Sequence, residues 1–169
     1  MQVSFHVRNA VGSDAAEIAR LSAELGYPAS VEEISSRLAR LLPQSAQFIA
    51  VAAGPERLLG WVQTERRMLL ESGEKAEIVG LVVGVEARRA GVGRALVLAA
   101  ERWAYSQRLG TVVVRSNIVR AESHPFYEGI GYERRKTQHT YAKVLRGDRQ
   151  GTRNGSTPRR NAPRNTPSG

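Results

Sequence analysis

The 169-residue sequence contains no cysteine and only three histidines. A disulfide framework, a thiolate nucleophile and a zinc-thiolate site are therefore excluded, although a cysteine-free chain can fold in either redox compartment. His6, His124 and His139 are scattered along the chain with no i,i+4 pair, so we expect no metal site.

Long apolar runs are also missing from the sequence. No stretch reaches the roughly 18 residues that a membrane-spanning helix requires, and residues 1–8 lack the apolar region of a signal peptide. We therefore expect a cytoplasmic protein without a membrane partner. The hydrophobic fraction of 41% and the charged fraction of 24% are typical of one globular domain with a real core.

The positive charge of the chain is concentrated near its C-terminal end. Six arginines and one aspartate from Arg146 onward contribute +5 of the net charge of +9. Residues 147–169 contain almost nothing apolar, so burial cannot offset the entropy lost on ordering them. We predict a globular domain over residues 1–145 and a basic, disordered tail over 146–169. We do not expect nucleic acid as the main partner, although a contact of the tail with an acidic partner stays open.

Hydrophobic periodicity predicts a mixed α/β fold that is not doubly wound. In chain order, the expected elements are a strand at 3–8, helices ending at Pro28 and Pro43, strands at 47–53, 58–67 and 76–85, a helix ending at Gly110, a strand at 111–115, a short helix at 122–130, and two final strands, the last at 139–145. A helix connects the strands at 76–85 and 111–115, so these two strands should be parallel by the usual right-handed crossover.

A glycine- and arginine-rich stretch, residues 88–94 (RRAGVGR), lies between the strand at 76–85 and the helix that follows. Unpaired backbone N–H groups at a helix start and glycines without side chains favour the binding of phosphate. A P-loop is excluded because Arg94 and Ala95 follow the last glycine in place of Lys and Ser or Thr. A dinucleotide fingerprint is excluded because Leu96 stands where a third small residue is needed. An ordinary loop with surface arginines would leave both glycines unexplained.

Residues 88–93 (RRAGVG) match the signature Gln/Arg-x-x-Gly-x-Gly/Ala, and residues 126–132 (FYEGIGY) match Phe-Tyr-x-x-x-Gly-Phe/Tyr. With these motifs and its order of elements, the chain resembles the GNAT superfamily of acetyl-CoA-dependent N-acetyltransferases over residues 1–145. The resemblance implies a mostly antiparallel sheet of about six to seven strands, with the fourth and fifth parallel and splayed, and helices on both faces. It also implies that the loop binds the pyrophosphate of CoA through Arg88, Arg89, Gly91, Val92, Gly93 and Arg94.

The same resemblance implies roles for residues of the fourth strand. Its backbone around Leu81 and Val83 would bind the pantetheine arm. Gly80 and Gly84 are costly in a strand, so they indicate either a bulge with a close ligand or a bulky neighbour such as Trp103. Glu77 shares a predicted apolar row with Val79, Leu81, Val83 and Val85. A carboxylate in such a row could accept the proton of the amine, directly or through water; the alternative is a solvated strand end.

Tyr127 corresponds to the family tyrosine that protonates the CoA thiolate, and a phenol can serve as that acid; simple aromatic packing is the alternative. The family asparagine that contacts pantetheine is replaced here by Arg120, and Asn117 is close enough in sequence to substitute for it. For His124, we expect a turn residue in preference to an active-site residue.

The resemblance therefore implies an enzyme that transfers acetyl from acetyl-CoA directly to a primary amine in a ternary complex, because no cysteine can carry an acetyl intermediate. We expect a small-molecule acceptor, with aminoglycoside-like amines included. Tyr27, Trp61 and Arg67 are as typical of the core or the surface as of residues that determine acceptor specificity. A protein or peptide acceptor, a non-catalytic CoA-binding module with a nucleic-acid-binding tail, and a homodimer stay open.

Overall fold

The computed structural model describes residues 4–115 and 123–145, which divide between two compact units, Met1–Arg135 and Lys136–Gly169. The first unit contains the elements β1 (His6–Asn9), the 3-10 turn η1 (Gly12–Asp14), α1 (Ala15–Glu24), α2 (Val31–Leu41), β2 (Gln47–Ala53), β3 (Leu58–Leu69), β4 (Gly73–Val83), the 3-10 turn η2 (Val85–Ala87), α3 (Val92–Ser106), β5 (Val112–Val114) and α4 (Ser123–Gly129). In the second unit, residues 136–145 form no helix or strand. Asn117 and Arg120 lie outside the described residues.

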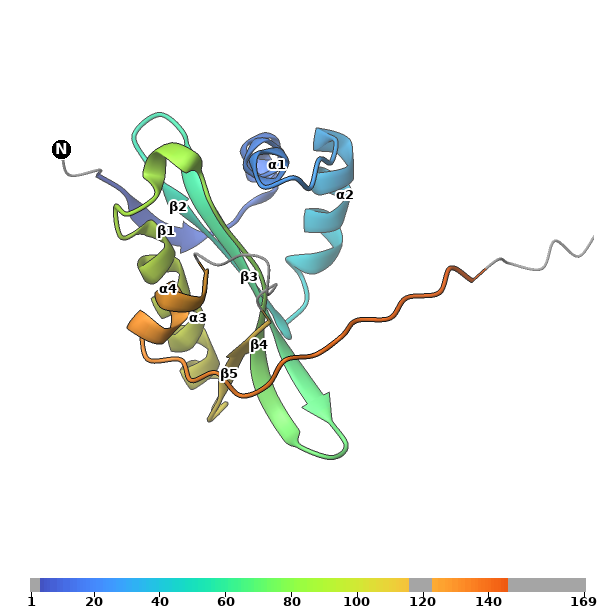
Figure 1. Ribbon diagram of the computed structural model, residues 1–169. Coiled ribbons are helices and arrows are strands. Elements are labelled where there is room, and N and C mark those ends of the chain that lie inside the picture. Colours follow the sequence, from blue (N-terminus) through green and yellow to red (C-terminus); the bar gives the residue numbers. More distant parts are fainter. Residues whose placement is uncertain (1–3, 116–122, 146–169) are drawn as a thin grey trace, which may run out of the picture. The chain divides into compact units, whose positions relative to one another are not determined.

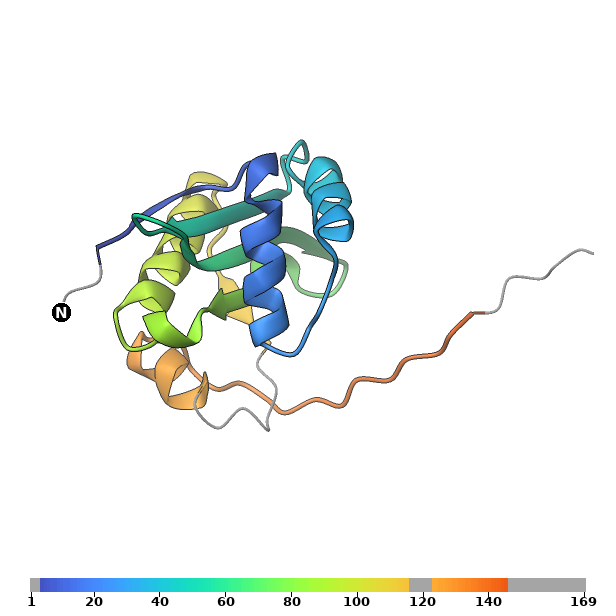
Figure 2. The same ribbon diagram turned by 90° about the horizontal axis from the view of Figure 1, so that it is seen from above.

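The strands form one sheet in the order β1-β2-β3-β4-β5, in which every pair is antiparallel except the parallel pair β4–β5. Helices α1 and α2 cover one face and α3 covers the other (Figure 1). The same layers are seen from above in Figure 2. On β2, Val51 packs with the α1–α2 cluster, whereas Ala50 and Ala52 pack with the α3 cluster. The predicted mixed α/β class with helices on both faces is confirmed.

Local sequence signals explain where the helices of the first layer begin. Ser30 Oγ accepts a hydrogen bond from the N–H of Glu33 at 3.1 Å, and the Glu33 carboxylate accepts one from the N–H of Ser30 at 2.8 Å. This reciprocal capping box satisfies two backbone donors that have no acceptor within the helix. Ser30 therefore fixes the start of α2 at Val31.

A β-bulge interrupts β4 at Val79. Thr64 of β3 pairs with Ile78, but the next residue, Gln63, pairs with Gly80, so Val79 has no partner on β3. An extra residue shifts the alternation of side chains by one position. Glu77 therefore lies on the same face of the sheet as Gly80 and Val82. The predicted row of Glu77 with Leu81 and Val83 is wrong, because those two side chains lie on the α3 face.

The parallel pairing of β4 with β5 is short. It runs from Ala76–Val112 to Ile78–Val114, whereas β4 continues to Val83. Beyond Ile78, β4 continues without β5, which ends at Val114, and the backbone of β4 from Val79 onward has no ladder partner on that side within the described residues. An unpaired strand edge of this kind can bind an extended ligand through backbone hydrogen bonds.

The two final strands predicted after Tyr132 are not formed, so the sheet has five strands in place of six to seven. A strand exists through hydrogen bonds to a neighbouring strand, and residues 132–145 make no such pairing. The segment begins with four consecutive charged residues, 133–136, and its apolar side chains Tyr141, Val144 and Leu145 are exposed. Without burial of those side chains, alternation alone does not hold a strand.

An ion pair connects β1 to the start of α1. The Arg8 guanidinium donates two hydrogen bonds of 2.8 Å to the Asp14 carboxylate, and the N–H of Val11 donates a third, also of 2.8 Å. Asp14 is 7% exposed. The Arg8 hydrogen bonds lower the pKa of Asp14 below its usual range, with smaller help from the Val11 N–H and the charge of Arg8, while burial opposes them.

We expect Asp14→Asn to lower the free energy of unfolding at pH 7 by about 1–3 kcal/mol. The folded-state pKa of Asp14 lies below its unfolded-state value, so its stabilisation is complete above the unfolded pKa, near 3.9. It is lost as the pH falls through the folded value, and the difference between variant and wild type should shrink toward pH 2. Urea unfolding at pH 7 and pH 2 measures both effects. The exposed Glu71→Gln is the control, and equal stability of Asp14→Asn and wild type at pH 7 would contradict the prediction.

Candidate active site

The loop between β4 and α3 has the backbone of an anion-binding turn. Arg89 and Gly91 have positive φ values of 63° and 82°, and α3 begins at Val92. The N–H of Ala95 donates to the carbonyl of Gly91 at 3.0 Å, which is the first helical hydrogen bond. The N–H groups of Val92, Gly93 and Arg94 precede it and have no intrahelical acceptor, and they lie at the positive end of the helix dipole. The loop can therefore bind a diphosphate.

The arginines of this loop add mobile positive charge around the backbone donors. Arg88, Arg89 and Arg94 are all exposed, and a diphosphate can be held by guanidinium groups in addition to N–H groups. The six loop residues that the resemblance assigned to pyrophosphate binding therefore lie together at the N-terminal end of α3. The η2 turn places them at the end of β4.

The two glycines of the motif serve different purposes. At Gly91 the positive φ is the constraint, since an added Cβ would meet nothing within 4 Å. At Gly93 packing is the constraint, since a Cβ would lie 3.3 Å from Phe126 Cζ and 3.5 Å from Val83 Cγ2. Phe126 therefore packs against the first turn of α3, and this contact brings the Phe-Tyr motif of α4 to the glycine loop.

We expect Gly91→Ala to weaken acetyl-CoA binding about tenfold, because a residue with a Cβ is strained by roughly 1–2 kcal/mol in the left-handed region and shifts the loop. Gly110→Ala is a matched control, because an added Cβ at Gly110 also meets nothing within 4 Å and no positive φ is involved. Isothermal calorimetry gives both dissociation constants. An unchanged dissociation constant in Gly91→Ala would show that the loop conformation does not matter for the ligand.

A cavity of about 470 Å³ lies beside the bulged part of β4. Helices α1 and α2 and strands β2 to β4 form most of its wall, and Val114, Arg115, Ser123 and Tyr127 close it on the side of β5 and α4. Its volume falls in the range of small-molecule binding sites. Gly80, Leu81 and Tyr127 line it together. Val83 is instead half-buried in the α3 cluster under Gly93.

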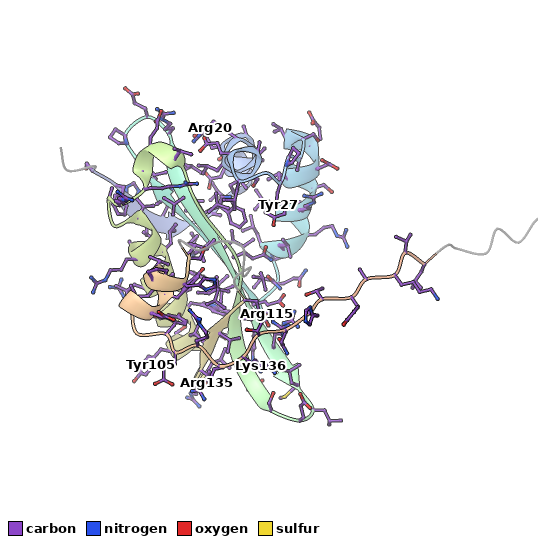
Figure 3. All side chains as sticks on the ribbon, viewed as in Figure 1. Arg20, Tyr27, Tyr105, Arg115, Arg135 and Lys136 are labelled. Atoms are coloured by element: carbon purple, nitrogen blue, oxygen red, sulfur yellow. The ribbon has the colours of Figure 1, made fainter. Side chains whose placement is uncertain are left out.

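The aromatic wall of the cavity comes from Tyr27, Trp61 and Tyr127. Figure 3 shows Tyr27 at the connection between α1 and α2. A Cβ at Gly80 would lie 2.6 Å from Trp61 Cζ3, so this glycine admits the Trp61 ring as well as ending the bulge. The bulky neighbour is thus Trp61 and not Trp103, whose ring stacks on Phe48 at 5.6 Å. A Cβ at Gly84 would meet Leu21 Cδ2 at 3.1 Å.

Glu77 lies behind the cavity wall in a cluster of charges. It is 4% exposed and is not among the described residues that line the cavity. Arg115 Nε lies 2.9 Å from Oε1, and Arg67 Nε lies 3.1 Å from Oε2. Arg67 Nε donates its hydrogen bond to Glu65 at 2.6 Å, so Oε2 of Glu77 is buried without a donor among the described residues. Oε2 therefore has the charge of Arg67 nearby but no hydrogen-bond donor among the described residues, and a buried oxygen in that state needs a functional or structural reason.

The two aromatic rings beside Phe126 differ in their surroundings. Tyr127 and Tyr132 pack edge to face with ring centroids 5.8 Å apart. Burial first, and then the nearby Glu101 carboxylate, raise the pKa of Tyr132. Tyr132 thus keeps its proton, and Tyr127 is the phenol on the cavity wall. His124 lies on α4 outside the described part of that wall.

Sequence reasoning missed two arginines of the cavity wall, Arg37 and Arg115. Arg115 directly follows the apolar strand β5, and a polar residue at the C-terminal end of a parallel strand is a usual sign of a ligand site. Arg37 lies on α2 beside the apolar stripe that contains Ile34 and Leu38. Such a position on a helix is equally typical of a solvated surface, so only the tertiary structure identifies it.

The described part of the chain contains neither a cluster of potential metal ligands nor a membrane-spanning helix. Over residues 4–115 and 123–145, no three acidic, histidine or cysteine side chains gather into a group that could hold a metal ion. Within the same residues, no helix is both long enough and apolar enough to cross a membrane.

The sequence model of the acetyltransferase (GNAT) family matches residues 15–132 of this chain. No curated protein sequence matches the chain. Among solved structures, the chain is similar to aminoglycoside 6'-N-acetyltransferase AAC(6')-IG from Acinetobacter haemolyticus, with a TM-score of 0.72 and 17% identity over 83% of this chain and 99% of that one. Glucosamine-6-phosphate N-acetyltransferase from Arabidopsis thaliana gives a TM-score of 0.71 and 18% identity, over 82% of this chain and 98% of that one.

A third similar structure is AAC(6')-Iy in complex with the bisubstrate analog CoA-S-monomethyl-acetylneamine. Its TM-score is 0.75 at 15% identity, over 84% of this chain and 99% of that one. At these identities the similarity establishes the shared fold.

Proposed function

The chain belongs to the acetyltransferase (GNAT) family, and on that premise we propose that it transfers the acetyl group of acetyl-CoA directly to a primary amine of a small molecule. The observation that carries this proposal is the contact of Phe126 with Gly93. The contact brings the glycine loop next to α4, whose Tyr127 lines the cavity beside the unpaired edge of β4, and these parts would form one continuous site. An acyl donor that is both a diphosphate and an extended amide chain fits these parts.

The loop residues Arg88, Arg89, Gly91, Val92, Gly93 and Arg94 would hold the pyrophosphate of CoA. The β4 backbone around Leu81 and Val83 would bind the pantetheine amides, because β4 has no ladder partner there on the side of β5. Backbone N–H groups on this edge would also polarise the thioester carbonyl. Asn117, which lies outside the described residues, stays a candidate for a pantetheine contact.

The reaction requires two proton movements. The amine nitrogen forms a bond to the thioester carbon, the carbon–sulfur bond breaks, and the amine nitrogen loses one proton while the sulfur gains one. Tyr127 lies on the cavity wall and would donate the proton to the thiolate. No cysteine is present to carry an acetyl intermediate, which favours direct transfer.

Glu77 would receive the proton of the amine through water. Its side chain lies behind the wall, and Arg115 is the wall residue paired with it, so a direct contact with the amine is not the expected route. The free acceptor capacity of Oε2 supports a role in proton transfer. The arginines on either side would position the carboxylate.

The choice of a small-molecule acceptor is supported by the size of the cavity, about 470 Å³. Two of the similar structures are enzymes named for small amines, an aminoglycoside and glucosamine 6-phosphate. The aminoglycoside-like acceptors expected from the sequence are one member of this class.

Three measurements on the wild-type protein test the proposed function. Calorimetry with acetyl-CoA should give a micromolar dissociation constant, and release of the CoA thiol should depend on an added primary amine. Mass spectrometry should find one acetyl group on the amine and none on the protein. Absence of acetyl-CoA binding would refute the proposal, and acetylation of a peptide but of no small amine would replace the acceptor class.

A further inference from the structure

Among the described residues, all charged side chains of the cavity wall are positive. The described lining residues include two arginines, Arg37 and Arg115, and no carboxylate. The rest of the wall is mainly apolar and aromatic, with Trp61 and Leu38 as examples. A bound molecule would therefore meet cations and hydrocarbon. If the protein transfers acetyl as proposed above, this wall selects the acceptor amine.

The acidic groups near these arginines lie outside the described wall. Glu77 pairs with Arg115 from behind the wall, and Glu65 pairs with Arg67. Glu33 lies one turn from Arg37 on the exposed side of α2, and its side chain is 56% exposed. These carboxylates set the positions of the arginines, but none of them faces the cavity as a described lining residue.

Of the two arginines in the cavity wall, Arg37 has the weaker interaction with a carboxylate. Its only partner among the described residues is Glu33, at the long distance of 3.8 Å. For comparison, Arg20 on α1 hydrogen-bonds with Glu17, Glu24 and the carbonyl of Leu58. Arg115 Nε lies 2.9 Å from Glu77. A guanidinium has five N–H donors in a planar fork that matches a carboxylate, so Arg37 keeps most of its binding capacity for a ligand.

We propose that the acceptor is a primary amine with an anionic group and an apolar body, of the size of an apolar α-amino acid, and that Arg37 binds the anion. The aromatic and aliphatic side chains around Trp61 then bury the apolar part. A carboxylate on Arg37 would make a charge-assisted hydrogen bond, and the free amine would point toward the thioester on β4.

The same wall disfavours a polycation. An aminoglycoside carries several ammonium groups, and each needs an acceptor when it leaves water. The described wall contains two guanidinium groups and no carboxylate that could accept hydrogen bonds from the ammonium groups. The ammonium groups would lie close to groups of the same charge, which disfavours binding. Among small amines, the wall therefore favours those that carry an anionic group and an apolar body.

A comparison of leucine with leucinamide tests the proposal, because the two differ in the carboxylate alone. The values of kcat/KM for both are measured by thiol release with wild type, Arg37→Gln and Arg40→Gln. Arg40 lies on the same helix and is exposed outside the described wall, so it is the matched control. We expect Arg37→Gln to lower the leucine/leucinamide ratio about ten- to a hundredfold, mainly through the KM of leucine, and Arg40→Gln to leave it unchanged. The different basicities of the two amines affect this ratio by the same factor in every variant, so they cancel when the ratios of two variants are compared.

Two further acceptors are tested. Kanamycin is a polycation, and glucosamine 6-phosphate carries an anionic group on a polar body. The inference is overturned if either is acetylated with a higher kcat/KM than leucine and phenylalanine, if Arg37→Gln behaves like Arg40→Gln, or if acetyl-CoA binds but no apolar amino acid is acetylated. Acetyl-CoA binding is measured separately for every variant. Its loss in the wild type would refute the proposed function itself, whereas intact binding with acetylation of kanamycin alone would refute only the acceptor class.

Discussion

Replacement of Tyr127 by phenylalanine is expected to lower kcat about 10²–10⁴-fold while the KM for acetyl-CoA stays within about twofold. The substitution removes the hydroxyl group of a residue that lines the cavity and keeps the ring. The edge-to-face contacts of that ring with Phe126 and Tyr132, at 5.0 and 5.8 Å, should be retained. Steady-state kinetics with a saturating amine measure the effect.

Tyr105→Phe is the control for this prediction. Tyr105 lies on α3 and is 85% exposed, away from the cavity wall (Figure 3). It should keep wild-type kcat and thermal stability. If Tyr127→Phe also keeps wild-type kcat, thiolate protonation does not depend on this phenol and the aromatic pair is a packing element.

Glu77→Gln is expected to lower kcat about 10²-fold, near the lower end of the range for general-base catalysis, because the proton must reach this residue through water. The glutamine keeps the shape of the side chain but cannot accept the proton of the amine. A variant at the neighbouring Glu65 separates this role from one in which Glu77 only positions Arg67.

Glu65→Gln is a matched control for Glu77→Gln. The two glutamates are directly opposite each other on β3 and β4, and both lie within ion-pair distance of Arg67. Arg67 separates two like charges that would otherwise destabilise the strand pair. Glu65→Gln therefore perturbs the same arginine while it leaves the proposed proton acceptor in place. Equal kcat values in the two variants would show that Glu77 acts through Arg67 and not as a base.

The local parts of the fold could be predicted from the sequence because they depend on near neighbours along the chain. The capping box at Ser30, the αL position at Gly91 and the helix that starts at Val92 follow from backbone sterics and from donors within a few residues. The parallel β4–β5 pair follows from chain connectivity. These same local rules pointed to residues 88–94 as the proposed phosphate-binding loop and excluded a P-loop and a dinucleotide fingerprint.

Other features depend on contacts between distant segments, and single-sequence patterns do not encode them. The bulge at Val79 moves Glu77 to the other face of the sheet, because register is set by the whole β3–β4 pair. The predicted final strands fail since alternation specifies a strand only where a partner is present.

The phosphate-binding motif and the order of the elements were therefore determined by the sequence itself, through short-range sterics and hydrogen bonds. The tertiary structure decided how these parts become a site. Packing of Phe126 on Gly93 places Tyr127 at the cavity. Packing of α2 across the sheet brings Arg37 to the opposite wall, and that long-range arrangement of charge is what defines the proposed acceptor.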